Sequence, residues 1–489
     1  MQFDIDVGLP NKWLNCYLGE AIDYGKTKKA NMASLDENTW VLELEDIEKN
    51  TSKVLQMLTF KERQSKSAKN EFEKGDILYG KLRPYLNKVI IAIENGVCSS
   101  EIIPIKCDPS FIEPRFLFYW LKSFEFLSFV NEVSYGVNMP RLGTKDGKKA
   151  PFRLAPLSEQ KRIVEKLDSL LAQVETIQQR LNNLPDIIKR FRQSVLAAAV
   201  SGKLTAQWRV ENNVELVTKV AELNLAERKA KLASRVQKAK QCEKPERFNI
   251  PKSWSWISID EGCIKITDGT HHSPVSTPEG DYKYVTSKNV REGYIDLSNI
   301  KYVSKEVHTE IYARCDVVKG DVLYVKDGAN TGLACVNDFE EEISLLSSVG
   351  VMKVASYLDP LYLQHYLNSP IGRKLMLDLM GGTAIKRLTL TKIKVSPLSL
   401  PPLNEQTEIV RLVEQYFALA DTLEKHLANA KARVDNLTQS ILAKAFRGEL
   451  VPQDPNDEPA DKLLERIKAA RLEAEKLEKA AKKAAKVKQ

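Results

Sequence analysis

The chain contains the same segment twice, and this repeat constrains the fold more than any other feature of the sequence. Residues 156–205 align with residues 402–451 without a gap, at an offset of 246 and with 17 identities in 50 positions. The repeat extends upstream, because LPNKW at 9–13 corresponds to IPKSW at 250–254 and EKGDILY corresponds to VKGDVLY. The 489 residues are therefore one unit used twice, with approximate internal two-fold symmetry.

Each repeated segment predicts a long helix with one apolar seam. The apolar residues alternate in spacings of four and three, which is typical of the a and d positions of a coiled coil. At 1.5 Å per residue each seam runs roughly 50 Å, and two equal seams related by a two-fold axis are expected to pair antiparallel. The predicted seam residues are Ile163, Leu167, Leu170, Val174, Ile177 and Leu181 in the first copy and Ile409, Val413, Tyr416, Leu423 and Leu427 in the second.

The ends of the two helices are also marked in the sequence. Ser158 and Asn404 are suited to cap the N-termini, and Gly202 and Gly448 are suited to end the helices. Pro185 lies inside the seam of the first copy only. Because the apolar phase continues past this proline, we expect a bend in the helix and not a break.

Stretches rich in β-forming residues precede each helical segment and predict two globular domains. We expect an α+β fold, in which two globular α/β domains are separated by two long antiparallel coiled-coil regions. The predicted segments are 1–152, 153–244, 245–398 and 399–489. Shorter helices are expected at 214–240 and 460–486, and their spare surface is expected to dock another protein as a helix bundle.

Composition excludes several classes of protein. The seven cysteines form no C-x-x-C pair, which argues against a disulfide framework or a structural zinc site and is typical of a reducing cytosol. The N-terminus does not have the pattern of a signal peptide, and the longest apolar runs are too short to span a bilayer. We therefore expect a cytoplasmic protein without a membrane partner.

The net charge of +8 is concentrated in one part of the chain. Residues 1–150 carry 21 basic and 21 acidic side chains, and residues 245–398 carry 18 and 19. Residues 151–244 carry 18 basic and only 10 acidic side chains. Any affinity of the globular domains for a polyanion must therefore come from local patches or from a partner protein.

No catalytic motif is present in either copy. The sequence contains no phosphate-binding loop, no G-x-G-x-x-G after a strand, no nucleophile elbow and no H-E-x-x-H. An enzyme with two equivalent halves would show its motif twice. We therefore predict a protein that is not an enzyme and binds no metal or cofactor of its own.

The polar residues near the shared G-D-[IV]-L-Y strand, and those on a probable loop of the second domain, suggest contacts with nucleic acid. Basic, amide and hydroxyl side chains are the groups that hydrogen-bond to base edges and phosphates. The candidate DNA-binding residues are Lys81, Arg83, Asn87, Lys88 and Arg141 in the first domain and Thr270, His271, Lys288, Asn289, Lys326, Asn330, Lys386 and Arg387 in the second.

Several of these segments resemble one known family. PLSEQKRIVEKLDSLLAQVE, PPLNEQTEIV and FRGELVPQDPNDEPADKLLERI resemble the conserved regions of type I restriction–modification specificity subunits. KGDILYGKLRPYLNK resembles one class of their target recognition domains, and DGTHHSP with KGDVLYVKDGANTG resembles another. The similarity covers nearly the whole chain.

This resemblance implies a non-catalytic reader of a bipartite site on double-stranded DNA. Each target recognition domain would bind one half-site in the major groove, and the coiled coil would fix the unread spacer. The helical regions would hold two methyltransferase subunits, which restriction subunits then join. S-adenosylmethionine would belong to the methyltransferase subunits, and ATP with Mg²⁺ to the restriction subunits.

The residues themselves add one expectation and leave two alternatives. Because the two domains differ around their shared strand, the half-sites should differ and the whole site should be asymmetric. One alternative is a scaffold that joins two proteins through the coiled coil and binds no nucleic acid. The other is a single-chain nuclease or methylase of an unrecognised type.

Overall fold

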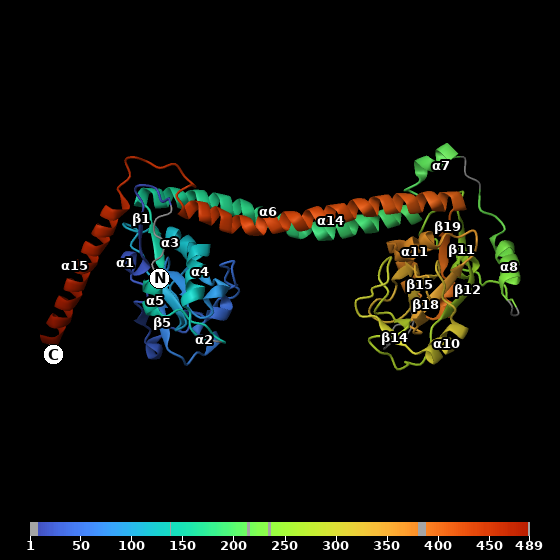
Figure 1. The fold of residues 1–489 in the computed structure, drawn as a ribbon, viewed down its shortest axis with the longest axis horizontal. Helices are drawn as coiled ribbons and strands as arrows, with labels where there is room; N and C mark the ends of the chain where they lie inside the picture. The colour runs from blue at the N-terminus through green and yellow to red at the C-terminus, as the bar shows by residue number, and fades with distance from the viewer. Residues whose placement is uncertain (1–7, 137, 213–215, 233–235, 380–387, 488–489) are drawn as a thin grey trace. The chain divides into compact units, whose positions relative to one another are not determined.

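A computed structural model describes residues 8–136, 138–212, 216–232, 236–379 and 388–487. The chain forms two compact units, one from Met1–Asn182 with Asn429–Gln489 and the other from Asn183–Ala428. The two long helices α6 (Leu157–Val200) and α14 (Leu403–Phe446) contribute residues to both units (Figure 1). The four predicted segments do not coincide with these units, and their boundaries stay a prediction.

The first unit contains a domain of three small sheets. β1 (Leu14–Tyr17) pairs antiparallel with β10 (Pro151–Leu154), next to the start of α6. A three-stranded sheet has the order β7-β6-β9, and a five-stranded sheet has the order β2-β5-β8-β3-β4. The strands are β7 (Val89–Ile91), β6 (Ile77–Gly80), β9 (Ile102–Ile105), β2 (Lys28–Lys29), β5 (Lys69–Phe72), β8 (Gly96–Ser99), β3 (Trp40–Leu42) and β4 (Leu58–Thr59). The helices of this domain are α1 (Leu18–Ala21), α2 (Phe60–Arg63), α3 (Pro114–Leu121), α4 (Phe124–Val133) and α5 (Thr144–Lys148), with short 3₁₀ turns η1 (Met32–Ser34), η2 (Leu44–Asp46) and η3 (Pro84–Leu86).

The domain of the second unit repeats this plan. β11 (Ser255–Ser258) pairs antiparallel with β19 (Pro397–Leu400), next to the start of α14. The other sheets have the orders β12-β18-β15-β16 and β14-β13-β17. These strands are β12 (Cys263–Asp268), β18 (Val349–Val354), β15 (Val322–Val325), β16 (Ala334–Val336), β14 (Lys301–Val303), β13 (Tyr282–Val285) and β17 (Ser344–Leu345). The helices are α9 (Ile259–Gly262), α10 (Lys305–Arg314), α11 (Pro360–Asn368), α12 (Pro370–Leu377) and α13 (Leu390–Lys394).

The strand partners show that the two domains share part of one topology, although β12 borders β18 only in the second domain and β5 and β2 extend the parallel pair only in the first. β6 lies between β7 and β9, as β15 lies between β16 and β18. β3 is parallel to β8, as β13 is parallel to β17, and an antiparallel strand borders each pair. The predicted α+β fold and the internal repeat are therefore confirmed.

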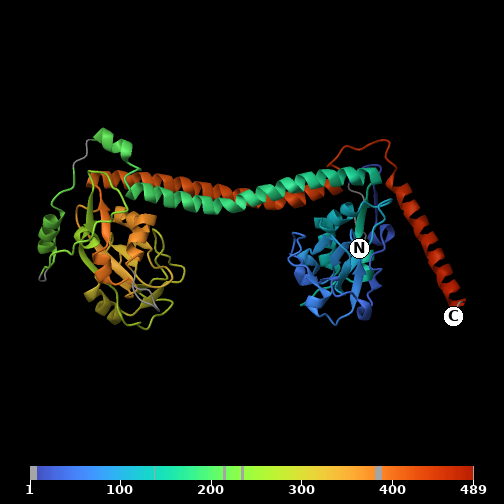
Figure 2. The same cartoon turned by 180° about the vertical axis from the view of Figure 1, so that it is seen from behind.

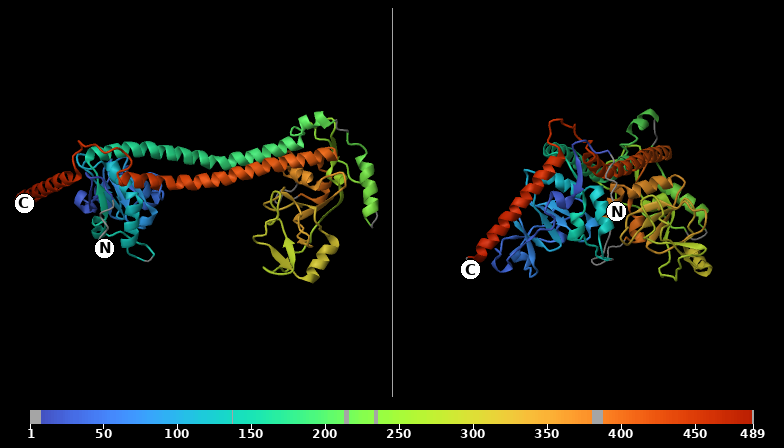
Figure 3. Two further views of the ribbon diagram at one scale, coloured as in Figure 1. Left: turned by 45° about the horizontal axis from the view of Figure 1, so that its top comes forward. Right: turned by 60° about the vertical axis from the view of Figure 1, so that its left-hand side comes forward.

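In each unit α6 and α14 pack antiparallel, as predicted (Figures 1 and 3). In the first unit the buried Ile163 and Leu167 share a core with Leu442, and in the second Leu196 shares a core with Ile409 and Val413. The early part of one helix therefore meets the late part of the other. Of the remaining seam residues, Val174 and Leu427 are buried and Leu170 and Leu181 are half-buried, whereas Ile177, Tyr416 and Leu423 are 44%, 37% and 46% exposed.

The ends of the helices follow the sequence signals. The backbone of Gly202 and Gly448 has φ of +76° and +72°, a conformation that favours glycine at the end of a helix. A Cβ atom at Gly448 would lie 2.3 Å from Pro10 Cγ, and one at Gly202 would lie 2.4 Å from Pro251 Cγ. Each long helix therefore ends against the first residues of a globular domain. α6 continues through Pro185 without a break.

Three shorter helices follow the long ones. α15 (Ala460–Val487) agrees with the predicted helix 460–486, and Figure 2 shows its far end away from the sheets of its unit. The prediction of a helix over 214–240 is wrong in its extent, because the described part of this region contains only α8 (Val220–Lys231), after the short α7 (Ala206–Asn212).

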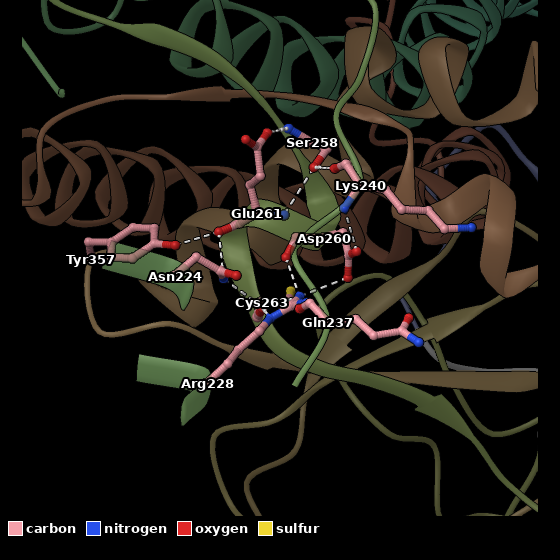
Figure 4. A network of polar contacts seen from close by, with 9 residues as sticks. All are labelled: Asn224, Arg228, Gln237, Lys240, Ser258, Asp260, Glu261, Cys263 and Tyr357. Carbon is pink, nitrogen blue, oxygen red and sulfur yellow. Dashed lines mark hydrogen bonds and ion pairs between the residues drawn. The ribbon is translucent and has the colours of Figure 1, made fainter. Parts of the chain in front are cut away.

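The difference at α8 has a local cause. Lys240, within the predicted helix, is instead held by Ser258 and Asp260 at the start of α9 (Figure 4). The Lys240 N–H donates to Asp260 Oδ2 at 2.9 Å, and the Ser258 hydroxyl donates to the Lys240 carbonyl at 2.5 Å. Within the described residues, no helix has the length and apolar character that crossing a bilayer requires.

Candidate nucleic-acid interfaces

In the first domain the predicted residues lie on a loop that leaves β6. Lys81 and Arg83 precede η3, and Asn87 and Lys88 follow it. Arg83 and Asn87 have φ of +50° and +48°, a left-handed conformation that is uncommon outside glycine. Non-glycine residues in this region are often found where the surrounding structure serves a binding function.

Arg141 joins this loop from a distant part of the chain. Its backbone forms a bridge with Leu82, and the Arg83 N–H donates to the Pro140 carbonyl at 2.7 Å. The Leu142 N–H donates to the Lys81 carbonyl at 3.0 Å. The structure therefore brings all five predicted residues of the first domain together.

The side chains of this loop do not all face solvent. The Lys88 ammonium donates to the Leu44 carbonyl at 2.7 Å, and burial lowers its pKa. Asn87 is 4% exposed, and its Oδ1 atom is buried without a hydrogen-bond partner among the described residues. These two side chains hold the loop against the domain, and their contact with DNA stays a prediction.

In the second domain three loops converge at the same place in the fold. They follow β12, β13 and β15 and contain six of the predicted residues. Asn330 Nδ2 donates to the Ser287 carbonyl at 2.8 Å, and the Lys326 N–H donates to the Ser348 carbonyl at 3.0 Å. The Ser347 N–H donates to the Thr270 carbonyl at 2.8 Å. Backbone hydrogen bonds therefore assemble one surface from segments far apart in the sequence.

A buried carboxylate organises the polar side chains of this surface. Asp268 is 2% exposed, and its carboxylate lies 2.8 Å from Arg314 Nη2, 3.3 Å from Lys326 Nζ and 3.4 Å from His271 Nε2. The side chains of Arg314 and His271 remain half exposed, and Arg314 Nη2 also donates to His271 Nε2 at 2.8 Å. Sequence reasoning missed Arg314, which lies 46 residues from Asp268 at the end of α10.

A polar cavity of about 710 Å³ lies beside this cluster in the second domain. Its lining includes the predicted residues Lys288, Asn289 and Asn330. Arg291 and Lys301 also line it and were not predicted. Donors of this kind suit phosphate oxygens and base edges. The lining residues also include Tyr284, whose buried hydroxyl has no hydrogen-bond partner among the described residues.

The remaining candidate groups do not add a second site. Lys386 and Arg387 lie outside the described residues, although the Leu388 N–H donates to the Lys326 carbonyl at 3.1 Å. A cavity of about 990 Å³ in the first domain contains none of the predicted residues. Its lining carries charges of both signs, and Glu71 and Glu73 are paired with Lys28 and Lys106. The described residues contain no group of three or more metal-binding side chains.

Two buried pairs of residues attach the domains to the helices. Glu159 and Gln160 begin α6, and Glu405 and Gln406 begin α14; all four are fully buried. Trp13 Nε1 donates to Glu159 at 2.9 Å, and Trp254 Nε1 donates to Glu405 at 2.8 Å. Gln160 binds two backbone groups and Gln406 binds three, at 2.8 to 2.9 Å. Burial raises the pKa of Glu159.

The second carboxylate oxygen of each glutamate binds the chain that follows the other long helix. Gln453, beyond the end of α14, donates to Glu159 at 2.6 Å, and Thr205, beyond the end of α6, donates to Glu405 at 2.6 Å. Each unit therefore has one junction at which a domain, a helix start and a helix end meet. The identities Glu159/Glu405 and Gln160/Gln406 were visible in the sequence, but their partners were not.

Comparison with known proteins agrees with this architecture. A family model for the type I restriction modification DNA specificity domain matches residues 12–186 and again 251–431. The specificity subunit of the type I restriction enzyme EcoBI from Escherichia coli is 34% identical over 400 residues, covering 79% of this chain and 77% of the relative. That of EcoKI from Escherichia coli strain K12 is 33% identical over 370 residues, covering 73% and 71%.

Two solved structures share the fold. A chain from a study of complex assembly and conformational transition in the type I R-M system has a TM-score of 0.65 at 19% identity, covering 91% of this chain and 100% of that chain. The HsdS subunit of Thermoanaerobacter tengcongensis has a TM-score of 0.58 at 20% identity, covering 90% of this chain and 98% of that subunit.

Proposed function

Because the chain belongs to the specificity subunits of type I restriction–modification systems, which recognise DNA and are not catalytic, we propose that it reads an asymmetric bipartite DNA site. Each globular domain binds one half-site through the loops described above. The observation that supports this most directly is the shared frame of the two loop surfaces. Lys81 and Lys326 make the same backbone contact, to Glu101 and to Ser348, while the side chains around them differ.

A common frame with different side chains favours two readers of different sequence. The backbone contacts fix the positions of the loops, and the side chains determine which base edges are complementary to the surface. In the first domain the frame carries Glu101 and Arg141, whereas the second carries Ser348 and the cluster around Asp268. Two half-sites bound in this way are expected to differ in sequence.

The long helices are proposed to set the spacer between the half-sites. Each is 44 residues in one continuous α-helix, or about 66 Å at 1.5 Å per residue. Inserting one heptad into both α6 and α14 adds roughly 10 Å to each helix and should lengthen the preferred spacer by about three base pairs. An unchanged spacer would contradict this part of the proposal.

We propose the partners on the basis of the family and of exposed apolar surface on the shorter helices. Two methyltransferase subunits bind the helical regions, and restriction subunits join them in the cytoplasm. The exposed Leu472 and Leu477 on α15 and Leu223 on α8 offer apolar surface for such subunits. S-adenosylmethionine is assigned to the methyltransferase subunits, and ATP with Mg²⁺ to the restriction subunits.

The decisive experiment is to sequence methylated DNA from cells that express the complete system. The expected motif is bipartite and asymmetric. A palindromic or contiguous motif would contradict the proposal, and a purified complex that binds no DNA would favour a scaffold.

Each half-site is then assigned by replacing Lys81 and Arg83 with alanine together. Recognition should weaken or relax at the half-site read by the first domain, while the other half-site is unaffected. Equal effects at both would show that the domains do not each read one half-site.

A further inference from the structure

The backbone of Arg141 is held on both sides at the recognition surface of the first domain. It forms one β-bridge with Leu82, on the loop after β6, and another with Tyr135. The Arg141 N–H donates to the Tyr135 carbonyl at 2.9 Å, and the Tyr135 N–H donates to the Arg141 carbonyl at 3.2 Å. The Cα position of this arginine is therefore fixed before any ligand binds.

One nitrogen of the Arg141 guanidinium is also fixed. Nε lies 3.2 Å from Glu101 Oε2, and the two side chains are 40% and 27% exposed. Within the part of the chain that the structure describes, Nη1 and Nη2 take part in no hydrogen bond or ion pair. The edge of the guanidinium that joins these two nitrogens is therefore free to bind a ligand.

Glu101 is held as firmly as the arginine it contacts. Its carbonyl accepts the Lys81 N–H at 2.9 Å, and its own N–H donates to the Ser99 hydroxyl at 3.3 Å. The residue directly precedes β9. The carboxylate therefore reaches Arg141 from the sheet, 40 residues away in the sequence.

Two other arginines of the domains, Arg63 and Arg291, do not present such an edge. Arg63 donates to Glu45 through Nη1 and pairs with Asp46 through Nη2. Arg291 donates to the Lys288 carbonyl through Nη1 and to Asp296 through Nη2. The terminal nitrogens of these two arginines already bind groups of the protein, whereas those of Arg141 do not.

A free Nη1–Nη2 edge matches one base in particular. Two parallel donors of this geometry bind the O6 and N7 acceptors that guanine presents in the major groove. The adjacent carboxylate partly neutralises the guanidinium, which lowers its value as a general phosphate contact and leaves the directional contact with a base edge.

We propose that Arg141 reads a guanine in the half-site bound by the first domain, and that Glu101 is the positioning residue that orients it. This inference rests on the proposed function and adds to it which residue reads the half-site and which base it reads. The second domain has Ser348 at the place of Glu101 in the frame, so this pair is a property of the first domain.

The test uses the full chain in complex with its methyltransferase subunits and duplexes that carry the methylated motif. Each guanine of the half-site assigned to the first domain is replaced in turn by 7-deazaguanine, which lacks the N7 acceptor. For the wild-type complex, binding should weaken roughly tenfold at one of these guanines. The Arg141→Gln complex should bind the natural and the 7-deaza duplex equally at that position.

Further variants separate base reading from other roles. Arg141→Lys keeps the charge but loses the planar two-donor edge and the Nε contact with Glu101, so its sensitivity to 7-deazaguanine should be clearly smaller than that of the wild type. Glu101→Gln keeps an acceptor oxygen and should retain most of the sensitivity, whereas Glu101→Ala should lose it while Arg141 is still present. Arg447→Gln is the matched control, because Arg447 pairs with Glu449 through Nε and Nη2 and is 46% exposed.

Several outcomes would overturn the inference. These are a half-site without a G·C pair, retained sensitivity in Arg141→Gln, undiminished sensitivity in Arg141→Lys, or weakening that is equal for every duplex. Failure of the proposed function looks different, because the wild-type complex itself would then show no bipartite preference. The unfolding temperature of each variant, compared with that of Arg447→Gln, identifies loss of folding.

Discussion

The two recognition domains hold equivalent loops with side chains from different positions. In the first domain Lys88 donates to the Leu44 carbonyl at 2.7 Å, and in the second Asn330 donates to the Ser287 carbonyl at 2.8 Å. Leu44 and Ser287 each lie two residues beyond the equivalent strands β3 and β13, but the strand pairing aligns Lys88 with Leu333 and Asn330 with Tyr85. The comparison shows that the two domains fix the same loop with different side chains, so the surface around it can differ in charge.

The shorter helices α15 and α8, which follow the coiled coil, are each attached to a domain by an arginine, but the contacts of the two arginines differ. Arg471 on α15 donates to the carbonyl of Gly19 at 3.1 Å, and Arg228 on α8 donates to that of Asp260 at 2.6 Å (Figure 4). Asp260 adds a carboxylate contact at 2.8 Å, and both partners are nearly buried. A side chain at Gly19 would lie 2.9 Å from Lys148 Cβ, so the first domain has no room for this addition.

The largest expected effect comes from removing these two arginines. Arg228→Ala leaves the Asp260 carboxylate buried without its partner and should cost about 3–5 kcal/mol in the free energy of unfolding of the second unit. Arg471→Ala removes two carbonyl contacts and a more distant ion pair, and should cost about 2 kcal/mol in the first unit. Hydrogen exchange, measured on peptides from each unit, gives the stability of the two units separately. Equal losses would contradict the difference inferred from Asp260.

A second comparison concerns pH. His365 on α11 is 6% exposed, and burial lowers its pKa to about 4. An unfolded histidine titrates near 6.5, so the unfolded state binds a proton between about pH 6.5 and pH 4 that the folded state excludes. The contribution of His365 to the free energy of unfolding is therefore fully present above pH 6.5, and it falls by on the order of 3 kcal/mol as the pH drops to about 4.

This loss should be confined to the second unit. All five histidines lie between positions 271 and 426, and Tyr119 takes the equivalent place in the first unit, where it donates to Asp168 at 2.5 Å. His365→Phe should remove most of the loss between pH 6.5 and pH 4, because no group at this position then titrates. Unfolding followed by hydrogen exchange at both pH values checks this. The same loss in the variant would assign it to other groups.

The smallest expected effect distinguishes two equivalent lysines. Lys81 forms no ion pair or side-chain hydrogen bond among the described residues, whereas Lys326 pairs with Asp268 and Asp327. Lys81→Ala should reduce the dependence of log binding constant on log salt concentration by about 1, as expected for one phosphate contact. Lys326→Ala should leave this slope nearly unchanged. Equal changes would show that Lys326 leaves Asp268 when DNA binds.

Those parts of the fold that depend on short stretches of sequence were predictable. The apolar spacing of the two seams, the glycines at the helix ends and the GD[IV]LY strands all act within a few residues of themselves. The predicted helix over 214–240 shows the limit of such patterns. Lys240, at the end of this range, forms hydrogen bonds with Ser258 and Asp260, and a local apolar periodicity cannot predict such contacts.

The recognition surfaces were predictable only as sets of candidates. Arg141 was among the candidates predicted from the sequence, but its partner Glu101 lies 40 residues away and is brought to it by the pairing of β9. Arg314 has no counterpart signal, since only the path of α10 brings it to Asp268. Long-range strand order therefore determines which candidates become neighbours, and one sequence does not reveal that order.

The buried glutamates at the helix starts have a consequence for how such a chain changes over generations. Glu159 and Glu405 bind a tryptophan of their own domain and the segment beyond the other helix, and these hydrogen bonds involve no residue of the recognition loops. Mutations in the loops therefore leave these junctions intact. The two copies can diverge independently, and under the proposed function each new pairing of half-sites is inherited in a chain that still assembles.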